Sequence, residues 1–318
     1  MRLNVPDIAA LNDARTILLI GMGGGYDIFC GLPLRYALQE IGKTVHLANL
    51  SFTALKFIKN AEILAPGVYG IKTDCRTVLQ YAPELHLAQH LSETVWCIGE
   101  IEVATQPVLR AFHALIAHLS PDAVVFVDGG VDSLMRGDEP EVGTLFEDAV
   151  SLSAAFQLPA SLPTVLVCLG LGAENDISYP HVWENIAALT KDGGFLGACA
   201  LTPQMEAYRA YETAVEFVHA QKFQEPSVIN ASVVSSVRGH FGDHHATERT
   251  KRSRLSISPQ MGLYWFFDLR TVANRSLVIT QIAYSETRRE ALQGLALVRS
   301  GGATATVKPG KPASHSHS

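Results

Sequence analysis

The chain has 318 residues, of which 47% are hydrophobic and 18% are charged, and its formal net charge is −6. A composition this rich in apolar residues and this poor in charged ones can bury a large core. It excludes a chain that is mostly disordered, of low complexity or a coiled coil. The excess of acidic over basic residues gives no field that would hold a polyanion, so we expect no nucleic-acid partner.

The sequence contains no segment that predicts a membrane span or an export signal. Its apolar runs, such as Ala123 to Val127, have the length of strands and fall far short of the roughly 20 residues that cross a bilayer. The N-terminal segment carries Asp and Pro residues where a signal peptide has a basic stretch and an apolar run. Irregularly spaced cysteines without a CxxC motif predict reduced core thiols at Cys30, Cys75, Cys97, Cys168 and Cys199. We therefore expect a soluble, cytoplasmic protein.

Strand-type and helix-type patterns alternate along the chain. Thr16 to Ile20 predicts a strand that ends at Gly21, Phe29 to Ile41 predicts a helix, and Thr44 to Leu50 predicts the next strand. Three further helix and strand pairs follow: Pro107 to Leu119 with Ala123 to Val127, Leu145 to Phe156 with Thr164 to Leu169, and His181 to Leu189 with Gly194 to Ala200. Because these strands are apolar throughout, we expect an α/β fold with a doubly wound, mostly parallel, Rossmann-like sheet and helices on both faces.

The last third of the chain changes in character. Gln204 to Gln221 predicts a long helix, Ser227 to Val237 is rich in Ser and Val, and Arg238 to Ser258 is polar and predicts a loop or lid. The remaining segments are predicted as strands at Leu263 to Leu269 and Ser276 to Thr280, a helix at Glu286 to Val298 and a disordered tail at Ser300 to Ser318. No linker divides the body, so we expect one domain over residues 1–299.

A glycine-rich run follows the first predicted strand, Gly21-Met22-Gly23-Gly24-Gly25-Tyr26-Asp27. Backbone N–H groups at a junction of strand and helix favour an anion, and glycines allow a ligand to approach closely. A tight turn without a ligand is the alternative. The run breaks the dinucleotide fingerprint, and the next strand ends near Asn49 without the acid that binds a ribose, so NAD is disfavoured. No Walker lysine follows the glycines, which excludes a P-loop.

Glycines and acids also follow two later strands. Asp128-Gly129-Gly130-Val131-Asp132 comes directly after one strand and is followed by Glu139, and Gly172, Glu174 and Asp176 come after the next. Each of these segments alone could be a turn or a helix cap. At the carboxyl ends of neighbouring parallel strands, however, the acids would share one crevice, bind a divalent ion or sugar hydroxyls, and raise one another's pKa values.

The segment from Arg238 to His245 contains His240, His244 and His245 with Asp243 between them. It could supply metal ligands or a proton shuttle in a lid, or it could be a solvated loop, because its spacing matches no standard zinc motif. The basic residues Arg249, Lys251, Arg252 and Arg254 that follow could attract an anionic substrate or form a solvated face. No G-x-S-x-G or H-E-x-x-H motif is present, so a serine hydrolase and a zincin are unsupported.

These blocks resemble DUF1152, a family of unknown function. The likeness lies in Gly23 to Asp27, in Val127 to Ser133 with the downstream Gly137, Glu139 and Asp148, and in Leu169 to Asp176. The chain departs from the family pattern at two positions. Tyr26 replaces a glycine of the first block, and Val131 separates Gly130 from Asp132 in the second. The resemblance implies no reaction. It implies that Asp27, Asp128, Asp132, Glu139 and Asp148 belong to one site.

We expect an enzyme, a hydrolase or lyase, acting on a small anionic or ribosyl-containing metabolite. The expected catalytic residues are Asp27 or Glu139, which would transfer a proton, and Asp128 and Asp132, which would bind hydroxyls or a divalent cation. The expected ligand-binding residues are Gly21, Gly23, Gly24, Gly25, Gly129, Gly130, Asp148, Gly172, Glu174 and Asp176. A non-catalytic sensor of a nucleotide-like metabolite and an S-adenosylmethionine-dependent methyltransferase are the alternatives, and a homo-oligomer is left open.

Overall fold

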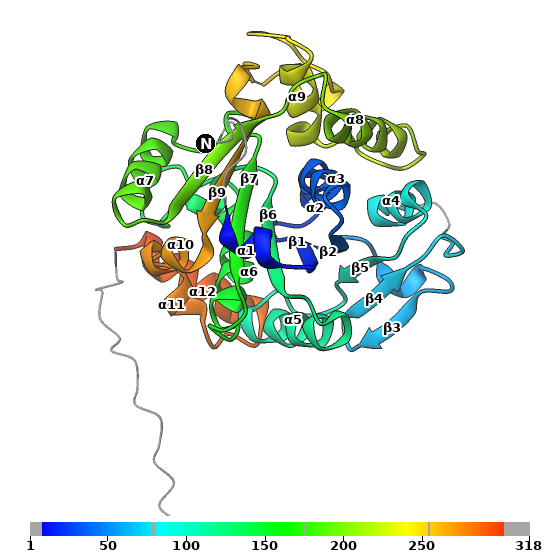
Figure 1. Ribbon diagram of the computed structural model, residues 1–318. Coiled ribbons are helices and arrows are strands. Elements are labelled where there is room, and N and C mark those ends of the chain that lie inside the picture. Colours follow the sequence, from blue (N-terminus) through cyan, green and yellow to red (C-terminus); the bar gives the residue numbers. More distant parts are fainter. Residues whose placement is uncertain (1–7, 78–79, 175, 254, 302–318) are drawn as a thin grey trace, which may run out of the picture.

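The apolar runs of the sequence form the centre of a nine-stranded sheet (Figure 1). The computed structural model describes residues 8–77, 80–174, 176–253 and 255–301. The strands lie in the order β3-β4-β5-β2-β1-β6-β7-β9-β8. Their bounds are β1 Thr16–Gly21, β2 Thr44–Leu50, β3 Glu62–Ala65, β4 Val68–Ile71, β5 Val95–Ile98, β6 Ala123–Asp128, β7 Thr164–Leu169, β8 Phe195–Ala200 and β9 Leu263–Asp268.

The core of the sheet is parallel, as the sequence predicts. β1 pairs in parallel with β2 and β6, β2 with β5, and β6 with β7. The outer strands add antiparallel pairs, since β4 runs against β3 and β5, and β9 runs against β7 and β8. The carboxyl ends of β1, β2, β6 and β7 therefore meet at one edge of the sheet.

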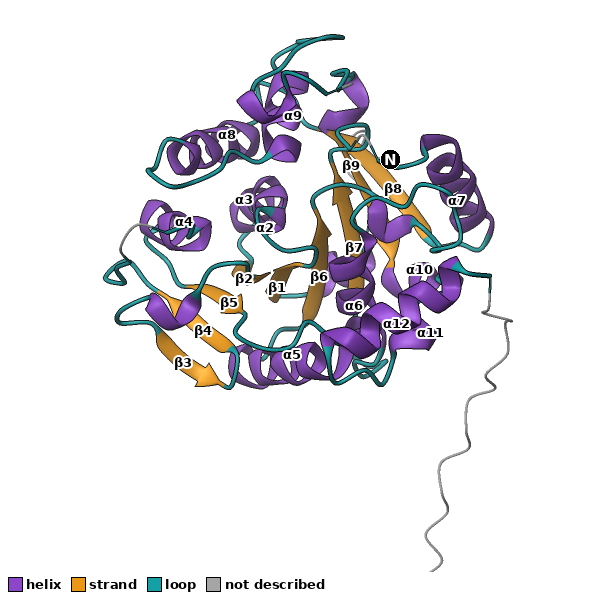
Figure 2. Ribbon diagram, turned by 180° about the vertical axis from the view of Figure 1, so that it is seen from behind, coloured by secondary structure: helices purple, strands orange, loops and turns teal. Residues whose placement is uncertain are grey.

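Helices cover both faces of this sheet (Figure 2). Their bounds are α1 Ala9–Asp13, α2 Asp27–Cys30, α3 Leu32–Glu40, α4 Pro83–Leu91, α5 Thr105–Leu119, α6 Leu145–Phe156, α7 Tyr179–Lys191, α8 Glu206–His219, α9 Val228–Val237, α10 Leu269–Arg275, α11 Ile279–Ile282 and α12 Arg288–Arg299. Side chains alternate along a strand, so Leu18 and Ile20 of β1 join a cluster with α5, α6, α7 and α10 to α12. Ile17 and Leu19 join the opposite cluster, with α2, α3, α4, α8 and α9.

Two sequence predictions of local structure are wrong. Ser276 to Thr280 is not a strand, because Ile279 and Ile282 are buried on one side of the short helix α11. The predicted helix from Phe29 to Ile41 is divided into α2 and α3 at Gly31. The sequence reading also missed β3, β4, β5, α1, α4, α9 and α10.

The cysteine prediction agrees with the structure. None of the five cysteines forms a disulfide, and all but the half-buried Cys199 are buried. In the part of the chain that the structure describes, no helix combines the length and the hydropathy that crossing a membrane requires. The predicted disordered tail falls outside the described residues from position 302 onward.

Candidate functional site

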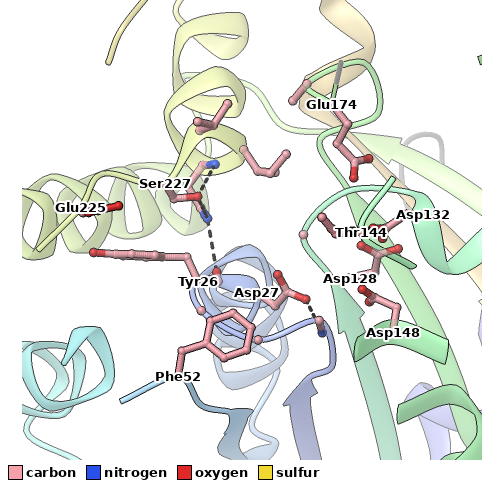
Figure 3. A pocket seen from close by; sticks show the side chains of 18 of the residues that line it. Tyr26, Asp27, Phe52, Asp128, Asp132, Thr144, Asp148, Glu174, Glu225 and Ser227 are labelled. Atoms are coloured by element: carbon pink, nitrogen blue, oxygen red, sulfur yellow. Dashed lines mark hydrogen bonds between the residues drawn. The ribbon is translucent and has the colours of Figure 1, made fainter. Parts of the chain in front are cut away.

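A cavity of about 750 Å³ opens at the sheet edge where the parallel strands end (Figure 3). Its walls come from the loop after β1, the loop after β6, the loop after β7 and the first turn of α6. The N-terminal turn of α9 and Phe52, which follows β2, close the other side. Open α/β sheets bind ligands at this edge, at the point where the strand order reverses. In this sheet that point lies between β1 and β6.

The structure brings most of the predicted residues to this cavity. Those that line it are Gly23, Gly24, Gly25, Asp27, Asp128, Gly129, Asp132, Asp148, Glu174 and Asp176. Those that do not are Gly21, Gly130, Gly172 and Glu139. Gly21 and Gly130 still matter for packing. A Cβ at Gly21 would lie 2.1 Å from Oδ1 of Asn49, and one at Gly130 would lie 2.7 Å from Oε2 of Glu174.

Glu139 does not take the place that the sequence reading gave it. Its carboxylate accepts hydrogen bonds from the backbone N–H groups of Arg136, at 2.9 Å, and Gly137, at 2.8 Å. The side-chain amide of Asn185 donates a third at 2.8 Å. These hydrogen bonds outweigh the effect of burial and lower the pKa of Glu139. The carboxylate therefore closes the turn at Arg136 and Gly137 and does not line the cavity, and we leave Glu139 out of the candidate site.

The glycine loop after β1 is shaped around Asp27. Gly24 and Gly25 have φ values of +94° and +57°, which side-chain-bearing residues adopt only at a cost. The backbone N–H of Gly23 donates to Oδ2 of Asp27 at 2.6 Å. The sequence reading expected this amide to hold an anion of the ligand. It instead donates to a carboxylate of the protein and is not free for that role.

Asp128 ends β6 and is held in one orientation. Its Oδ2 accepts hydrogen bonds from the backbone N–H and the hydroxyl of Ser133, and Sγ of Cys168 lies 3.7 Å away. Asp128 is 1% exposed. One oxygen of Asp128, one of Asp27 and one of Asp148 all lie within 4.8 Å of one another. Three acidic groups from three separate segments thus converge on one point.

Two further acids line the same wall of the cavity. The hydroxyl of Thr144 donates to Oδ2 of Asp132 at 3.0 Å, and the backbone N–H of Val131 donates to Oε2 of Glu174 at 3.0 Å. Figure 3 shows both side chains on the same side as Asp128 and Asp148, with Asp27 facing them from the glycine loop. Asp176 also lines the cavity, but its side chain is exposed, which places it at the rim.

Burial raises the pKa values of these carboxyl groups, and repulsion between neighbouring acids raises them further. The pKa of Asp27 rises to about 8, that of Asp128 to about 7 and that of Asp132 to about 8. The pKa values of Asp148 and Glu174 also rise well above the usual range, for the same two reasons. Protonated and ionised carboxyl groups therefore coexist near neutral pH, as acid–base catalysis requires.

These raised pKa values predict that the metal-free protein loses stability as the pH rises. Between the unfolded pKa of about 4 and the folded values near 7 to 8, the native state binds more protons than the unfolded state, so the free energy of unfolding falls with pH. In EDTA, Asp148→Asn should raise that free energy by about 1–2 kcal/mol at pH 8 and by less at pH 5. Urea unfolding at both pH values measures this effect, and a stabilisation that does not grow with pH would contradict it.

The sequence reading missed the aromatic side of the cavity. Tyr26, Phe52, Tyr81 and Phe223 all line it, and Figure 3 shows Tyr26 and Phe52 across the cavity from Asp128 and Asp148. Phe52 could have been found, because it follows the second predicted strand at the same sheet edge. Phe223 carried no comparable signal, since it comes from the connection between α8 and α9.

Asn230, near the start of α9, was missed as well. Its side-chain amide donates to the backbone oxygen of Tyr26 at 3.3 Å and to the hydroxyl of Ser227 at 3.0 Å. Its Oδ1 accepts from the hydroxyl of Tyr211 at 2.9 Å. Asn230 thereby connects α9 to the glycine loop.

The histidine-rich segment does not line the cavity. His240 stacks on His244 with ring centroids 3.8 Å apart, and Nε2 of His245 lies 2.7 Å from Oδ1 of Asp243. Of the basic residues that follow, Arg249 reaches the cavity, whereas Arg254 falls outside the described residues. Nothing in these contacts makes the histidines ligands of the acidic site.

Searches of curated proteins and of solved structures found no significant match to this chain. The model of one protein family, described as a protein of unknown function, matches residues 18–304 and so covers nearly the whole chain. That match includes all three loops that end β1, β6 and β7. The chain therefore belongs to the DUF1152 family, as its glycine and aspartate blocks indicate.

Proposed function

We propose that this protein is an enzyme, a hydrolase or lyase, that acts on a small anionic or ribosyl-containing metabolite in the cavity. The observation that carries the proposal is the two-sided lining of the cavity. Asp128, Asp132, Asp148 and Glu174 face it from one side, and Asp27 and the aromatic rings of Tyr26 and Phe52 face it from the other. Five carboxyl groups gathered in one cavity cost stability, and such a cost is typical of functional sites.

The acidic side suits a substrate with several hydroxyl groups. Carboxylates accept hydrogen bonds from the hydroxyls of a ribose, and Oε1 of Glu174 receives no hydrogen bond from the described residues. Asp132 accepts a hydrogen bond from the hydroxyl of Thr144 through Oδ2, and Glu174 accepts one from the backbone N–H of Val131 through Oε2. We propose that these two residues exchange protons with the leaving group and with the attacking water or the substrate carbon.

The aromatic side suits a planar ring attached to the ribosyl group. Stacking of a base on an aromatic side chain contributes about 1–3 kcal/mol. Phe52 is 56% exposed and its ring packs against Gly24, whose absent Cβ would lie 2.4 Å from Cζ of that ring. The glycine thus leaves room for the tip of the Phe52 ring against the loop at the mouth of the cavity. Arg249 at the same mouth could meet a phosphate or carboxylate group.

The strand order supports a Rossmann-like origin for the core. Taken in chain order, the parallel strands β1, β2, β5, β6 and β7 are arranged 3-2-1-4-5, as in doubly wound nucleotide-binding folds. The cavity lies where the order reverses, between β1 and β6. We also propose that the protein binds a small molecule and no nucleic acid, and that it is located in the cytoplasm.

The proposal is tested by incubating the purified protein with nucleosides, nucleotides and sugar phosphates and following their loss by mass spectrometry. We expect one compound class to be consumed, with Asp132→Asn lowering turnover about 10²-fold or more. Asp138→Asn is the matched control, because Asp138 lies in the same region of the chain, is exposed and does not line the cavity. Binding of a metabolite that is returned unchanged would instead support a sensor and refute catalysis.

One observation favours a second candidate, an S-adenosylmethionine-dependent methyltransferase. β9 lies antiparallel between β7 and β8, so the seven strands from β5 to β8 are arranged 3-2-1-4-5-7-6, which extends the doubly wound order that binds nucleotide cofactors at the sheet edge after β1. An acidic cavity would also attract the sulfonium cation of that cofactor. Against it, the buried Asn49 at the end of β2 takes the place of the ribose-binding acid, and its amide donates to Gly25 and Glu84. Saturable binding of S-adenosylmethionine in calorimetry would favour this candidate.

A further inference from the structure

The three aspartates of the cavity are spaced as ligands of one ion. Of the described residues, only Asp27, Asp128 and Asp148 form a group of three or more acids, histidines or cysteines whose ligand atoms lie this close, within 4.8 Å. Oxygens on opposite sides of one ion are separated by about 4 Å for Mg²⁺ and about 5 Å for Ca²⁺. The spacing therefore suits a hard divalent cation.

Asp148 provides an independent indication of a missing partner. Its side chain is 3% exposed, and its Oδ1 has no hydrogen-bond partner within the described part of the chain. A buried polar atom without a partner carries the full cost of losing its hydration. Figure 3 shows this carboxylate turned toward that of Asp128.

The charge around the site is also unbalanced. Among the described residues that line the cavity, Arg249 alone is basic, and its side chain is 58% exposed and 3.7 Å from the carboxylate of Glu225. The acids deep in the cavity therefore have no cation beside them. An anionic substrate would be repelled from this wall unless a positive charge were added there.

We propose that Asp27, Asp128 and Asp148 together bind one hard divalent cation of the Mg²⁺, Mn²⁺ or Ca²⁺ class. The donor set consists only of carboxylate oxygens, which these ions prefer to the nitrogen and sulfur ligands of zinc or copper sites. Because three carboxylates leave coordination positions open toward the cavity, water and an oxygen of the substrate complete the shell. The role of the substrate oxygen rests on the proposed function, whereas binding of the ion does not.

The test is isothermal titration calorimetry of EDTA-treated, desalted protein with Mn²⁺, Mg²⁺ and Ca²⁺ in turn. We expect one ion per chain for at least one of them, and Asp148→Asn should weaken that binding by about 100-fold or more. Asp138→Asn should bind as the wild type does. A melting curve in EDTA shows that Asp148→Asn is folded, since this variant is expected to be at least as stable as the wild type.

Three results would overturn the inference. They are no binding of any of the three ions at millimolar concentration, unchanged binding by Asp148→Asn, and equal weakening by Asp138→Asn. Failure of the inference and failure of the proposed function are distinguishable. An ion that binds without any metabolite being consumed refutes the enzyme and leaves the ion site standing. If the protein binds no ion and consumes a metabolite at the same rate in EDTA, the ion site is refuted and the proposed enzyme stands.

Discussion

Replacing Asp128 with asparagine is expected to lower turnover by about 10²–10⁴-fold without unfolding the protein. The asparagine oxygen can still accept the hydrogen bonds from Ser133, so the end of β6 keeps its local structure. The negative charge that faces Asp27 and Asp148 is lost, and with it one of the three converging oxygens. Turnover of the substrate found in the metabolite screen measures the effect.

Stability distinguishes this loss of function from misfolding. In EDTA, Asp128 is repelled by Asp27, so removing its charge should leave the melting temperature unchanged or raise it. Asp138→Asn should keep both its activity and its melting temperature. Wild-type turnover by folded Asp128→Asn would show that Asp128 takes no part in catalysis.

Gly23→Ala is the second change with a large expected effect. A Cβ at this position would lie 2.6 Å from Oδ2 of Asp27 and 2.6 Å from Oδ2 of Asp148. Both carboxylates would have to move, and Asp27 would lose its 2.6 Å hydrogen bond from the backbone N–H of Gly23. We expect Mn²⁺ affinity to fall at least about tenfold, with a loss of about 1–3 kcal/mol in the free energy of unfolding.

Gly194→Ala is the matched control for this steric effect. Its Cβ would lie 2.5 Å from Cγ2 of Thr271, which does not line the cavity. A similar loss of stability with unchanged Mn²⁺ affinity is expected there. If Gly194→Ala weakened Mn²⁺ binding as much as Gly23→Ala does, the effect would be one of general destabilisation.

The parallel core and three loops of the cavity could be predicted because the physical rule is local. Apolar runs that do not alternate predict buried parallel strands, and their ends must meet at one sheet edge. Glycines and acids directly after β1, β6 and β7 are therefore brought together wherever those strands are neighbours. The sequence showed this without any knowledge of the helices that cover the sheet.

What could not be predicted depends on contacts between distant segments. Ser227 to Val237 forms α9 because Ser227 caps it and because Val233 and Val234 pack into the core, although its β-branched residues disfavour a helix. Glu139 is the converse case, a residue that the sequence reading placed in the site and that does not line the cavity. An acid near a strand end can face a ligand or close a turn, and only the position of the amides of Arg136 and Gly137 decides between them.

Asp148 was placed in the site through family resemblance and not through any pattern of its own. It lies inside a predicted helix, where an acid is ordinary. It reaches the cavity because α6 packs against the loop after β1, and the hydroxyl of Ser151 donates to the backbone oxygen of Met22 at 2.7 Å. This contact joins residues 129 positions apart, beyond what local periodicity can show.

A crystal of EDTA-treated protein soaked in Mn²⁺ and measured for anomalous scattering tests the central claim most directly. We predict one strong peak between Asp27, Asp128 and Asp148, at the roughly 2.0–2.6 Å that a hard ion keeps from carboxylate oxygens. No peak there, or a peak only beside the histidines at His240 to His245, would contradict the assignment of these three aspartates as the ion site of the cavity.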